Sequence, residues 1–274
     1  MERQVVEYEV ADRIATIRLN RPERLNSWTG RMSSEYRTAL LAAADDPQVR
    51  VIVVTGAGRG FCSGADSDAL AGHAERGGYD SGLGEGAPRP GYGVRAEFDA
   101  DMAYHFGVDK PIIAAINGPA AGIGFALACY CDLRFAARGA KLTTAHGRLG
   151  LPAEFGLSWL LPKLIGLTHA AELLFSSRIF LAEEAAEMGL VNRLLEPGDL
   201  MGAVYDYAAQ LATTVSPASL RVTKRQLYRD LVAGNPADSI EDATVTMDEM
   251  MAGPDYREGV VALREKRAPR FGLS

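Results

Sequence analysis

The sequence predicts an α/β fold in which a strand-rich core, residues 1–196, is followed by a helical C-terminal region, residues 197–274. Two apolar runs, residues 51–55 and 111–116, each lead into a glycine-rich turn and then into a helix-like stretch, an alternation typical of parallel sheets. Beyond residues 196–198 the apolar residues recur mainly at helical spacing. The 274 residues, 47% of them hydrophobic, suffice for one large domain or for one domain with an appendage.

The N-terminal segment predicts an antiparallel hairpin and then a helix. Residues 5–10 and 14–19 are strand-like runs on either side of a short connection at residues 11–13. The helix that follows has one apolar face and ends near residues 45–47. That face holds Met32, Tyr36, Leu40 and Leu41.

The stretch from residue 111 to residue 131 carries no charge and has about the length of a membrane span. Residues 117–119, Asn-Gly-Pro, interrupt it, and its two halves have the character of a strand and a helix. We therefore expect a buried strand, a turn and a buried helix here, with another short strand at residues 133–137.

The C-terminal third predicts a series of helices. They are expected at residues 182–188, 200–213, 240–251 and 256–266, and another begins with Ser216 as its N-cap and Pro217 as its first residue. In the core, residues 72–93 are rich in glycine and show little apolar pattern. We expect that segment to be a mobile surface loop, placed to act as a lid because it follows the first glycine turn.

Composition and charge narrow the class of partners. A net charge of −6 argues against nucleic acid and against an anionic membrane surface as the main partner. The three cysteines, Cys62, Cys129 and Cys131, do not form a disulfide framework and fit a reducing compartment. The first residues show no signal-peptide core, so a cytoplasmic protein is expected.

The two glycine-rich turns, residues 56–66 and 117–124, are the most informative feature for chemistry. Glycine lacks a Cβ, so the backbone can approach a ligand closely and present its N–H groups to it. Two such turns on parallel strands can direct a pair of amides at one oxygen, which is the arrangement of an oxyanion site. Cys62 in the first turn also fits a nucleophile-elbow pattern, but it stands too far from the end of the strand-like run for that role.

Several motifs in this order resemble those of the crotonase superfamily, the enoyl-CoA hydratase/isomerase family. The motifs are Asn20-Arg21-Pro22 with Leu25-Asn26, the turn through Gly64-Ala65-Asp66, Ile116-Asn117-Gly118-Pro119-Ala120, Cys131-Asp132-Leu133-Arg134, the run 185–192 and Lys266-Arg267-Ala268-Pro269. The resemblance implies a spiral of ββα units in residues 1–196. It also implies that residues 197–274 form a helical oligomerisation region, in homotrimers or dimers of trimers.

The resemblance also implies a substrate and a set of site residues. Members of the family bind an acyl-CoA thioester and polarise its carbonyl with two backbone amides, which in this sequence would be those of Ala65 and Ile123. CoA arrives as part of the substrate, so no metal and no other cofactor is expected. The expected substrate-binding residues are Arg24, Leu25, Ala65, Asp66, Ser67, Gly122, Phe155, Trp159 and Lys266.

The sequence departs from the family pattern at its acid/base residues. Family hydratases commonly use two glutamates, and the aligned positions here hold Ala126 and His146. Glu154 instead stands where related isomerases place an acid for proton chemistry. Beside apolar walls from Phe155 and Trp159, partial desolvation is expected to raise the pKa of Glu154 toward working pH. His146, which titrates near neutrality when unperturbed, is a second acid/base candidate.

These features leave three functions open. The first is an enoyl-CoA hydratase, which adds water to a 2-enoyl-CoA through an oxyanion-stabilised enolate. The second is an enoyl-CoA double-bond isomerase that uses Glu154 as a single acid/base. The third is a protein that binds acyl-CoA without catalysis and has lost the two glutamates.

Overall fold

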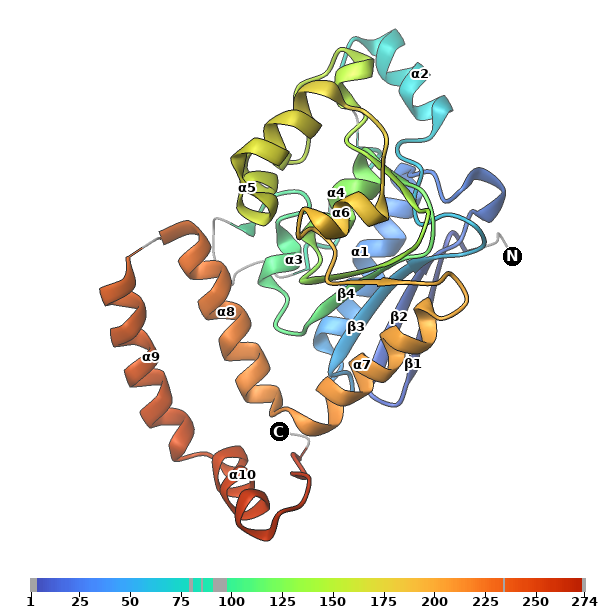
Figure 1. Cartoon of the computed structure of the whole chain (residues 1–274). Coiled ribbons are helices and arrows are strands. Elements are labelled where there is room, and N and C mark those ends of the chain that lie inside the picture. The colour runs from blue at the N-terminus through green and yellow to red at the C-terminus, as the bar shows by residue number, and fades with distance from the viewer. Residues whose placement is uncertain (1–3, 79–80, 85, 91–97, 234, 273–274) are drawn as a thin grey trace.

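The computed structural model describes residues 4–78, 81–84, 86–90, 98–233 and 235–272. A six-stranded sheet runs through its centre in the order β1-β2-β3-β4-β6-β9 (Figure 1). The strands are β1 (Val6–Ala11), β2 (Ile14–Leu19), β3 (Val51–Gly56), β4 (Ile112–Ile116), β6 (Leu133–Ala137) and β9 (Arg193–Leu195). β1 and β2 pair antiparallel, and each further neighbouring pair is parallel.

Helices cover both faces of this sheet, which explains why its central strands are apolar throughout. In β3, Ile52 and Val54 belong to the core on the side of α1 and α4, whereas Val51 and Val53 belong to the core on the side of α7. The three covering helices are α1 (Gly30–Asp45), α4 (Ile123–Tyr130) and α7 (Leu200–Thr214). The prediction of an α/β fold with a C-terminal helical region is confirmed.

A smaller sheet of β5 (Ala120–Ala121), β7 (Lys141–Thr143) and β8 (Phe180–Leu181) lies beside the main one. The shorter helical segments are η1 (Pro22–Arg24), α2 (Ser67–Arg76), α3 (Tyr104–Gly107), η3 (His146–Leu149) and α6 (Ala182–Glu187). The longer ones are α5 (Leu157–Ser176), α8 (Pro217–Ala233), α9 (Pro236–Met251) and α10 (Pro254–Glu265).

Several local predictions are confirmed. The N-terminal hairpin turns through Asp12 and Arg13, whose φ angles of 49° and 66° are left-handed, as tight hairpin turns require. The uncharged stretch 111–131 forms β4, the second glycine turn and the fully buried helix α4. No helix in the described part of the chain is long and apolar enough to cross a membrane.

The C-terminal helices differ in how they meet the core. α7 packs its apolar side onto the sheet and α8 contacts the core through Tyr228, while α9 and α10 extend away from the sheet (Figure 1). Ser216 caps α8 as predicted, because its Oγ accepts a hydrogen bond of 3.0 Å from the Ser219 amide. α9 begins at Pro236, earlier than predicted, because the Asn235 side chain caps it by accepting from the Ala237 amide. The division of the chain near residues 196–198 stays a prediction.

One buried polar cluster joins α8 to the sheet. The Asp132 carboxylate accepts hydrogen bonds from Lys224 Nζ at 2.8 Å, from Tyr228 Oη at 2.6 Å and from the Ile112 amide at 2.6 Å. Lys224 also donates to the Lys110 carbonyl at 3.0 Å. Burial, reinforced by the Asp132 charge, raises the pKa of Tyr228, so its hydroxyl remains a donor. The cluster fixes the position of α8 relative to the start of β4.

The expected loop at residues 72–93 begins later than predicted, because Gly72 lies inside α2. Asp66 starts this helix: its Oδ1 accepts from the Asp68 amide at 3.0 Å, and its carbonyl accepts from the Leu70 amide. The described residues 77–78, 81–84 and 86–90 form neither helix nor strand. Residues 79–80, 85 and 91–93 of the predicted loop lie outside the described residues.

Candidate active site

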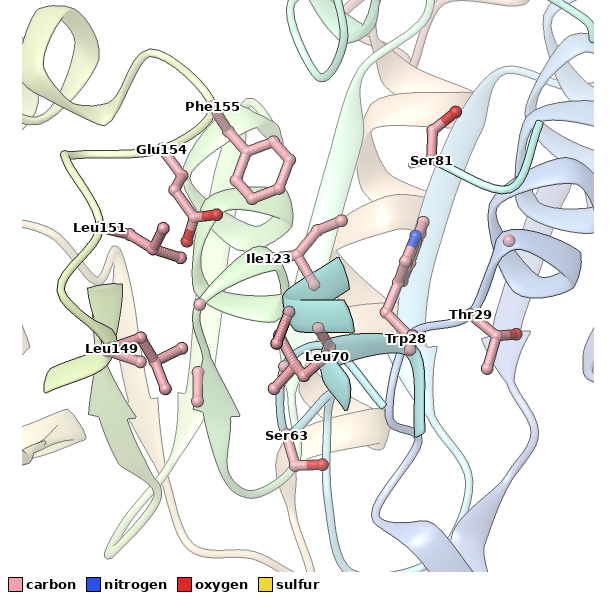
Figure 2. Close-up of a pocket in the computed structure, with 18 of the residues that line it drawn as sticks. Trp28, Thr29, Ser63, Leu70, Ser81, Ile123, Leu149, Leu151, Glu154 and Phe155 are labelled. Carbon is pink, nitrogen blue, oxygen red and sulfur yellow. The ribbon is translucent and has the colours of Figure 1, made fainter. Parts of the chain in front are cut away.

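A cavity of about 720 Å³, here called the main cavity, opens where the two glycine turns meet (Figure 2). One wall comes from Trp28 and its neighbours, and the opposite wall comes from residues 149–155. α2 contributes small and apolar side chains, among them Leu70. The lining is mostly apolar, so a ligand group that enters the cavity is transferred from water into an apolar environment.

Backbone hydrogen bonds hold the two glycine turns together. The Cys62 amide donates to the Pro119 carbonyl at 3.0 Å, and the Ala121 amide donates to the Cys62 carbonyl at 3.0 Å. A Cβ on Gly124 would lie 2.2 Å from the Cys62 carbonyl oxygen, so only glycine permits this approach. Gly122, with φ of 51° and ψ of −119°, turns the chain into α4 beside the first turn. Gly124 is therefore required by the close contact, and Gly122 by its positive φ angle.

The backbone geometry directs the Ala65 and Ile123 amides away from their own neighbours. The Trp28 amide donates to the Gly64 carbonyl at 2.7 Å, and the Asp66 amide donates to the Trp28 carbonyl at 2.9 Å. Because peptide groups alternate along an extended segment, the Ala65 amide faces the other side. Ile123 is the first residue of α4, where an amide has no acceptor within the helix. No described residue accepts a hydrogen bond from either amide, and both residues line the main cavity.

Asp66 does not line the main cavity, and its side chain stabilises the first glycine turn. Its carboxylate is buried and accepts from Arg21 at 2.8 Å and from the Ser27 hydroxyl at 2.8 Å. Burial alone would raise the pKa of Asp66, but the hydrogen bonds from Ser27 and Arg21 outweigh it and lower the pKa. Asp66 thus holds the first turn in place, whereas the sequence had indicated substrate contact.

Glu154 is the one ionisable side chain among the described residues that line the main cavity. It is half-buried. Figure 2 shows its carboxylate in the wall formed with Leu151 and Phe155, turned toward the side where Ile123 lies. The structure therefore brings together the predicted acid and both predicted amide donors at one cavity.

A tight turn sets the position of Glu154. Phe155 and Gly156 follow it with left-handed φ angles of 52° and 68°, and Gly156 caps α5. The Tyr130 hydroxyl donates to the Phe155 carbonyl at 2.8 Å, and the Leu157 amide donates to the Glu154 carbonyl at 3.0 Å. A Cβ on Gly156 would lie 2.8 Å from Tyr130 Oη. α4, through Tyr130, thus helps to fix the turn that carries the acid.

The two positions that hold glutamates in family hydratases lie behind the wall of the main cavity. Ala126 is fully buried in α4, and His146 is 5% exposed in η3; neither lines the main cavity. Ala145 and Leu149 on either side of His146 do line it. His146 Nδ1 has no hydrogen-bond partner among the described residues. The structure therefore does not place His146 beside the other candidate groups.

The remaining predicted binding residues do not line the main cavity. Trp159 is 37% exposed, and its ring lies under the Lys163 ammonium, 4.6 Å from the ring centroid. Lys266 follows α10, at the opposite end of the molecule from α2 (Figure 1). Arg24 and Ser67 are exposed, and Leu25 is half-buried near the first turn. Of the predicted binding residues, the cavity lining includes Ala65, Gly122 and Phe155.

Trp28 and Leu70 line the main cavity although the sequence had not indicated them. Trp28 arrives through its backbone pairing with Ala65, a long-range contact that leaves no periodic signal. For Leu70 a signal existed, because Ala69, Leu70 and Ala74 are spaced as one face of a helix.

The described residues offer neither a reactive cysteine nor a cluster of metal ligands. Cys62, Cys129 and Cys131 are buried, and desolvation raises the pKa of Cys62 to about 12. A thiol held in this state is a poor nucleophile. Within the described residues no group of three or more His, Cys, Asp or Glu side chains is placed to hold a metal ion.

Comparison with known proteins places the chain in a family. The family model for enoyl-CoA hydratase/isomerase matches residues 9–273. A probable enoyl-CoA hydratase of Mycobacterium bovis is 38% identical over 264 residues, which cover 94% of this chain and 89% of that protein. The 1,2-epoxyphenylacetyl-CoA isomerase of Escherichia coli is 33% identical and covers 94% of each chain.

The structural comparison agrees. The crystal structure of a probable enoyl-CoA hydratase/isomerase from Mycobacterium abscessus superimposes with a TM-score of 0.85 at 33% identity, covering 97% of this chain and 98% of that one. The fold is therefore that of the crotonases, as the motifs had indicated. The chain belongs to the enoyl-CoA hydratase/isomerase family.

Proposed function

We propose that this protein is an enoyl-CoA hydratase, which adds water to a 2-enoyl-CoA through a thioester enolate. The observation that supports this most directly is the meeting of the Ala65 and Ile123 amides and the Glu154 carboxylate at one apolar cavity. The names of the relatives from Mycobacterium bovis and Mycobacterium abscessus support the same activity.

In the proposed reaction the Ala65 and Ile123 amides donate hydrogen bonds to the thioester oxygen. Glu154 takes a proton from a water molecule while the water oxygen bonds to Cβ, and the π electrons move onto the thioester oxygen. The proton then returns to Cα as the enolate collapses, so one carboxylate does the work that two glutamates share in other hydratases. An oxyanion donor of this kind typically contributes about 3–4 kcal/mol. Proton transfer by a positioned side chain contributes about 10²–10⁴-fold in rate.

CoA binding is proposed to involve the residues around the first turn. Arg24, Leu25 and Ser67 lie on this side, and the Ser63 hydroxyl, which lines the main cavity, donates to the Arg24 carbonyl at 3.2 Å. Lys266 does not line the main cavity and follows α10, which lies at the end of the molecule opposite α2. If Lys266 contacts CoA, it does so in a neighbouring copy, which agrees with the proposed homotrimer or dimer of trimers. No cofactor besides the CoA of the substrate is proposed, and the cytoplasm is the proposed location.

A double-bond isomerase is the second candidate, and the single carboxylate favours it. Glu154 would take a proton from Cγ or Cα and return it at the other end of the same enolate, which needs no second acid and no bound water. The Escherichia coli relative named an isomerase supports this alternative.

The two activities are separated by mass spectrometry of enoyl-CoA substrates in isotopic water. In ¹⁸O-water, a 2-enoyl-CoA thioester is expected to give a product heavier by one labelled water, and a 3-enoyl-CoA thioester is expected to remain unchanged. Deuterium uptake in D₂O with no added oxygen and a displaced double bond would instead show an isomerase. Tight acyl-CoA binding with an unchanged thioester over the whole panel would contradict both and favour a non-catalytic binder.

A further inference from the structure

A second cavity of about 410 Å³, here called the side cavity, lies next to the main one. Its walls come from α1, from the segment around Ser81 and from residues 99–104. Ser81 lines both cavities, so the two share a wall. Figure 2 shows Ser81 on the side of the main cavity that Trp28 forms, opposite Glu154. The side cavity therefore lies beyond the end of the main cavity that is farther from the acid.

A row of buried rings connects the walls of the two cavities. Trp28 packs edge-on against Tyr36, with 5.6 Å between ring centroids. Tyr36 Oη forms a 2.7 Å hydrogen bond with His105 Nε2, and the His105 ring stacks on Tyr104 at 4.5 Å. Desolvation lowers the pKa of His105 to about 3, so the row is uncharged at neutral pH. Tyr104 lines the side cavity.

Two buried donors lie beneath the side cavity without acceptors. Arg37 and Tyr104 both line it and are 6% and 4% exposed. Among the described residues nothing accepts a hydrogen bond from Arg37 Nε or from the Tyr104 hydroxyl, although the Arg37 guanidinium is near enough to Tyr104 Oη to act on it as a donor. The Arg37 guanidinium lies over the Tyr104 ring, 5.0 Å from its centroid, so the two donors are close together. Burial raises the pKa of Tyr104, which keeps the hydroxyl protonated. Buried donors are normally paired, so this pair indicates a site for an acceptor.

The charges around the side cavity are balanced. Arg37 pairs with Asp101 at 2.6 Å, and Arg89 lies 3.5 Å from Asp99. All four side chains line the side cavity. A carboxylate or phosphate placed there would add an uncompensated negative charge beside two aspartates. An uncharged oxygen, such as that of a hydroxyl or a ketone, accepts hydrogen bonds without this penalty.

We propose that the side cavity binds an uncharged oxygen atom at the far end of the substrate's acyl chain. The substrate is then an acyl-CoA whose chain carries a hydroxyl or keto group remote from the thioester. The reacting carbons lie between Glu154 and the two amides, and the chain runs past Ser81 to Tyr104 and Arg37. This proposal rests on the proposed acyl-CoA function and names its substrate class.

The test measures binding of unreactive, saturated acyl-CoAs by isothermal titration calorimetry. Hexanoyl-, octanoyl- and decanoyl-CoA are each compared with the ω-hydroxy compound of the same length. At one of these lengths the hydroxyl compound is expected to bind about tenfold more tightly, the effect of one satisfied buried hydrogen bond. Tyr104→Phe removes only the hydroxyl and is expected to abolish that preference, whereas Tyr8→Phe, at an exposed tyrosine, keeps it.

A variant that removes the charge of Asp101 tests whether the side cavity prefers an uncharged group. Asp101→Asn leaves the Arg37 charge without its partner, so ω-carboxyoctanoyl-CoA is expected to bind more tightly to this variant than to the wild type. A wild type that prefers the carboxylate would overturn the assignment of an uncharged group. Equal binding within every pair, or a hydroxyl preference that survives Tyr104→Phe, would overturn the proposal while leaving the proposed function intact. If no acyl-CoA binds at all, the proposed function fails as well.

Discussion

The two walls of the main cavity differ in the chemical groups that they contribute, since one presents backbone groups and the other a side chain. The wall of the glycine turns offers backbone amides, and its geometry is fixed by hydrogen bonds between the turns and by glycines that admit no Cβ. The wall of residues 149–155 offers a single carboxylate on a turn held by Tyr130. Chemistry on the first wall depends on the path of the backbone, whereas chemistry on the second depends on one side chain. Substitutions should therefore affect the first wall through stability and the second through rate.

The largest effect is expected from Glu154→Gln. Loss of the proton-transfer group should lower kcat by about 10²–10⁴-fold, measured on the substrate that the isotope experiment identifies. The melting temperature should change little, because the side chain lines a cavity. Glu9→Gln, at an exposed glutamate in β1 and distant in sequence from Glu154, is the matched control and should leave kcat unchanged. A variant with more than a third of wild-type kcat would show that Glu154 is not the acid/base.

Gly124→Ala tests the glycine wall. The added Cβ would meet the Cys62 carbonyl at 2.2 Å, so the two turns must separate, at a cost of about 3 kcal/mol in the free energy of unfolding. Urea unfolding followed by circular dichroism measures this. Gly202→Ala, where nothing lies within 4 Å of the new Cβ in helix α7, should instead be neutral or stabilising by up to about 1 kcal/mol. Equal effects of the two substitutions would disprove the close contact.

Asp66→Asn tests the support behind that wall. Removing the charge leaves Arg21 without its partner and should cost about 2 kcal/mol of stability at pH 7. Because the folded-state pKa of Asp66 is lowered, its stabilisation is present above the unfolded value of about 3.9 and is lost as pH falls through the folded value. The difference between wild type and variant should therefore shrink below about pH 4. A difference that stays constant down to pH 2 would contradict the assigned ion pair.

Tyr130→Phe is expected to have the smallest effect and to couple the two walls. It removes the hydrogen bond to the Phe155 carbonyl, worth about 1 kcal/mol of stability. Because that bond positions the turn after Glu154, kcat should fall several-fold while KM changes less. A loss of stability with unchanged kcat would show that α4 does not position the acid.

The glycine turns leave a clearer signal in the sequence than do the side chains that face the cavity. A glycine-rich segment directly after an apolar strand is recognisable in the sequence. Ala65 and Ile123 followed from these segments and from the family motifs. Which side chains face the cavity depends on helix rotation and on left-handed residues. Trp159 is on the outer side of α5, and His146 turns inward beside Ala145, whose φ is 63°. Neither orientation has a periodic signal, and the pairing of Trp28 with Ala65 has none either.

The Asp132 cluster has a consequence for how the parts of the molecule are aligned. Asp132 holds both Lys224 and Tyr228 of α8 and the amide of Ile112, the first residue of β4. The other end of that strand leads directly into the second glycine turn. The cluster thus ties α8 to β4, the strand that precedes the second glycine turn and the Ile123 amide. A shift of α8 along its axis would therefore strain the same carboxylate that holds the start of β4.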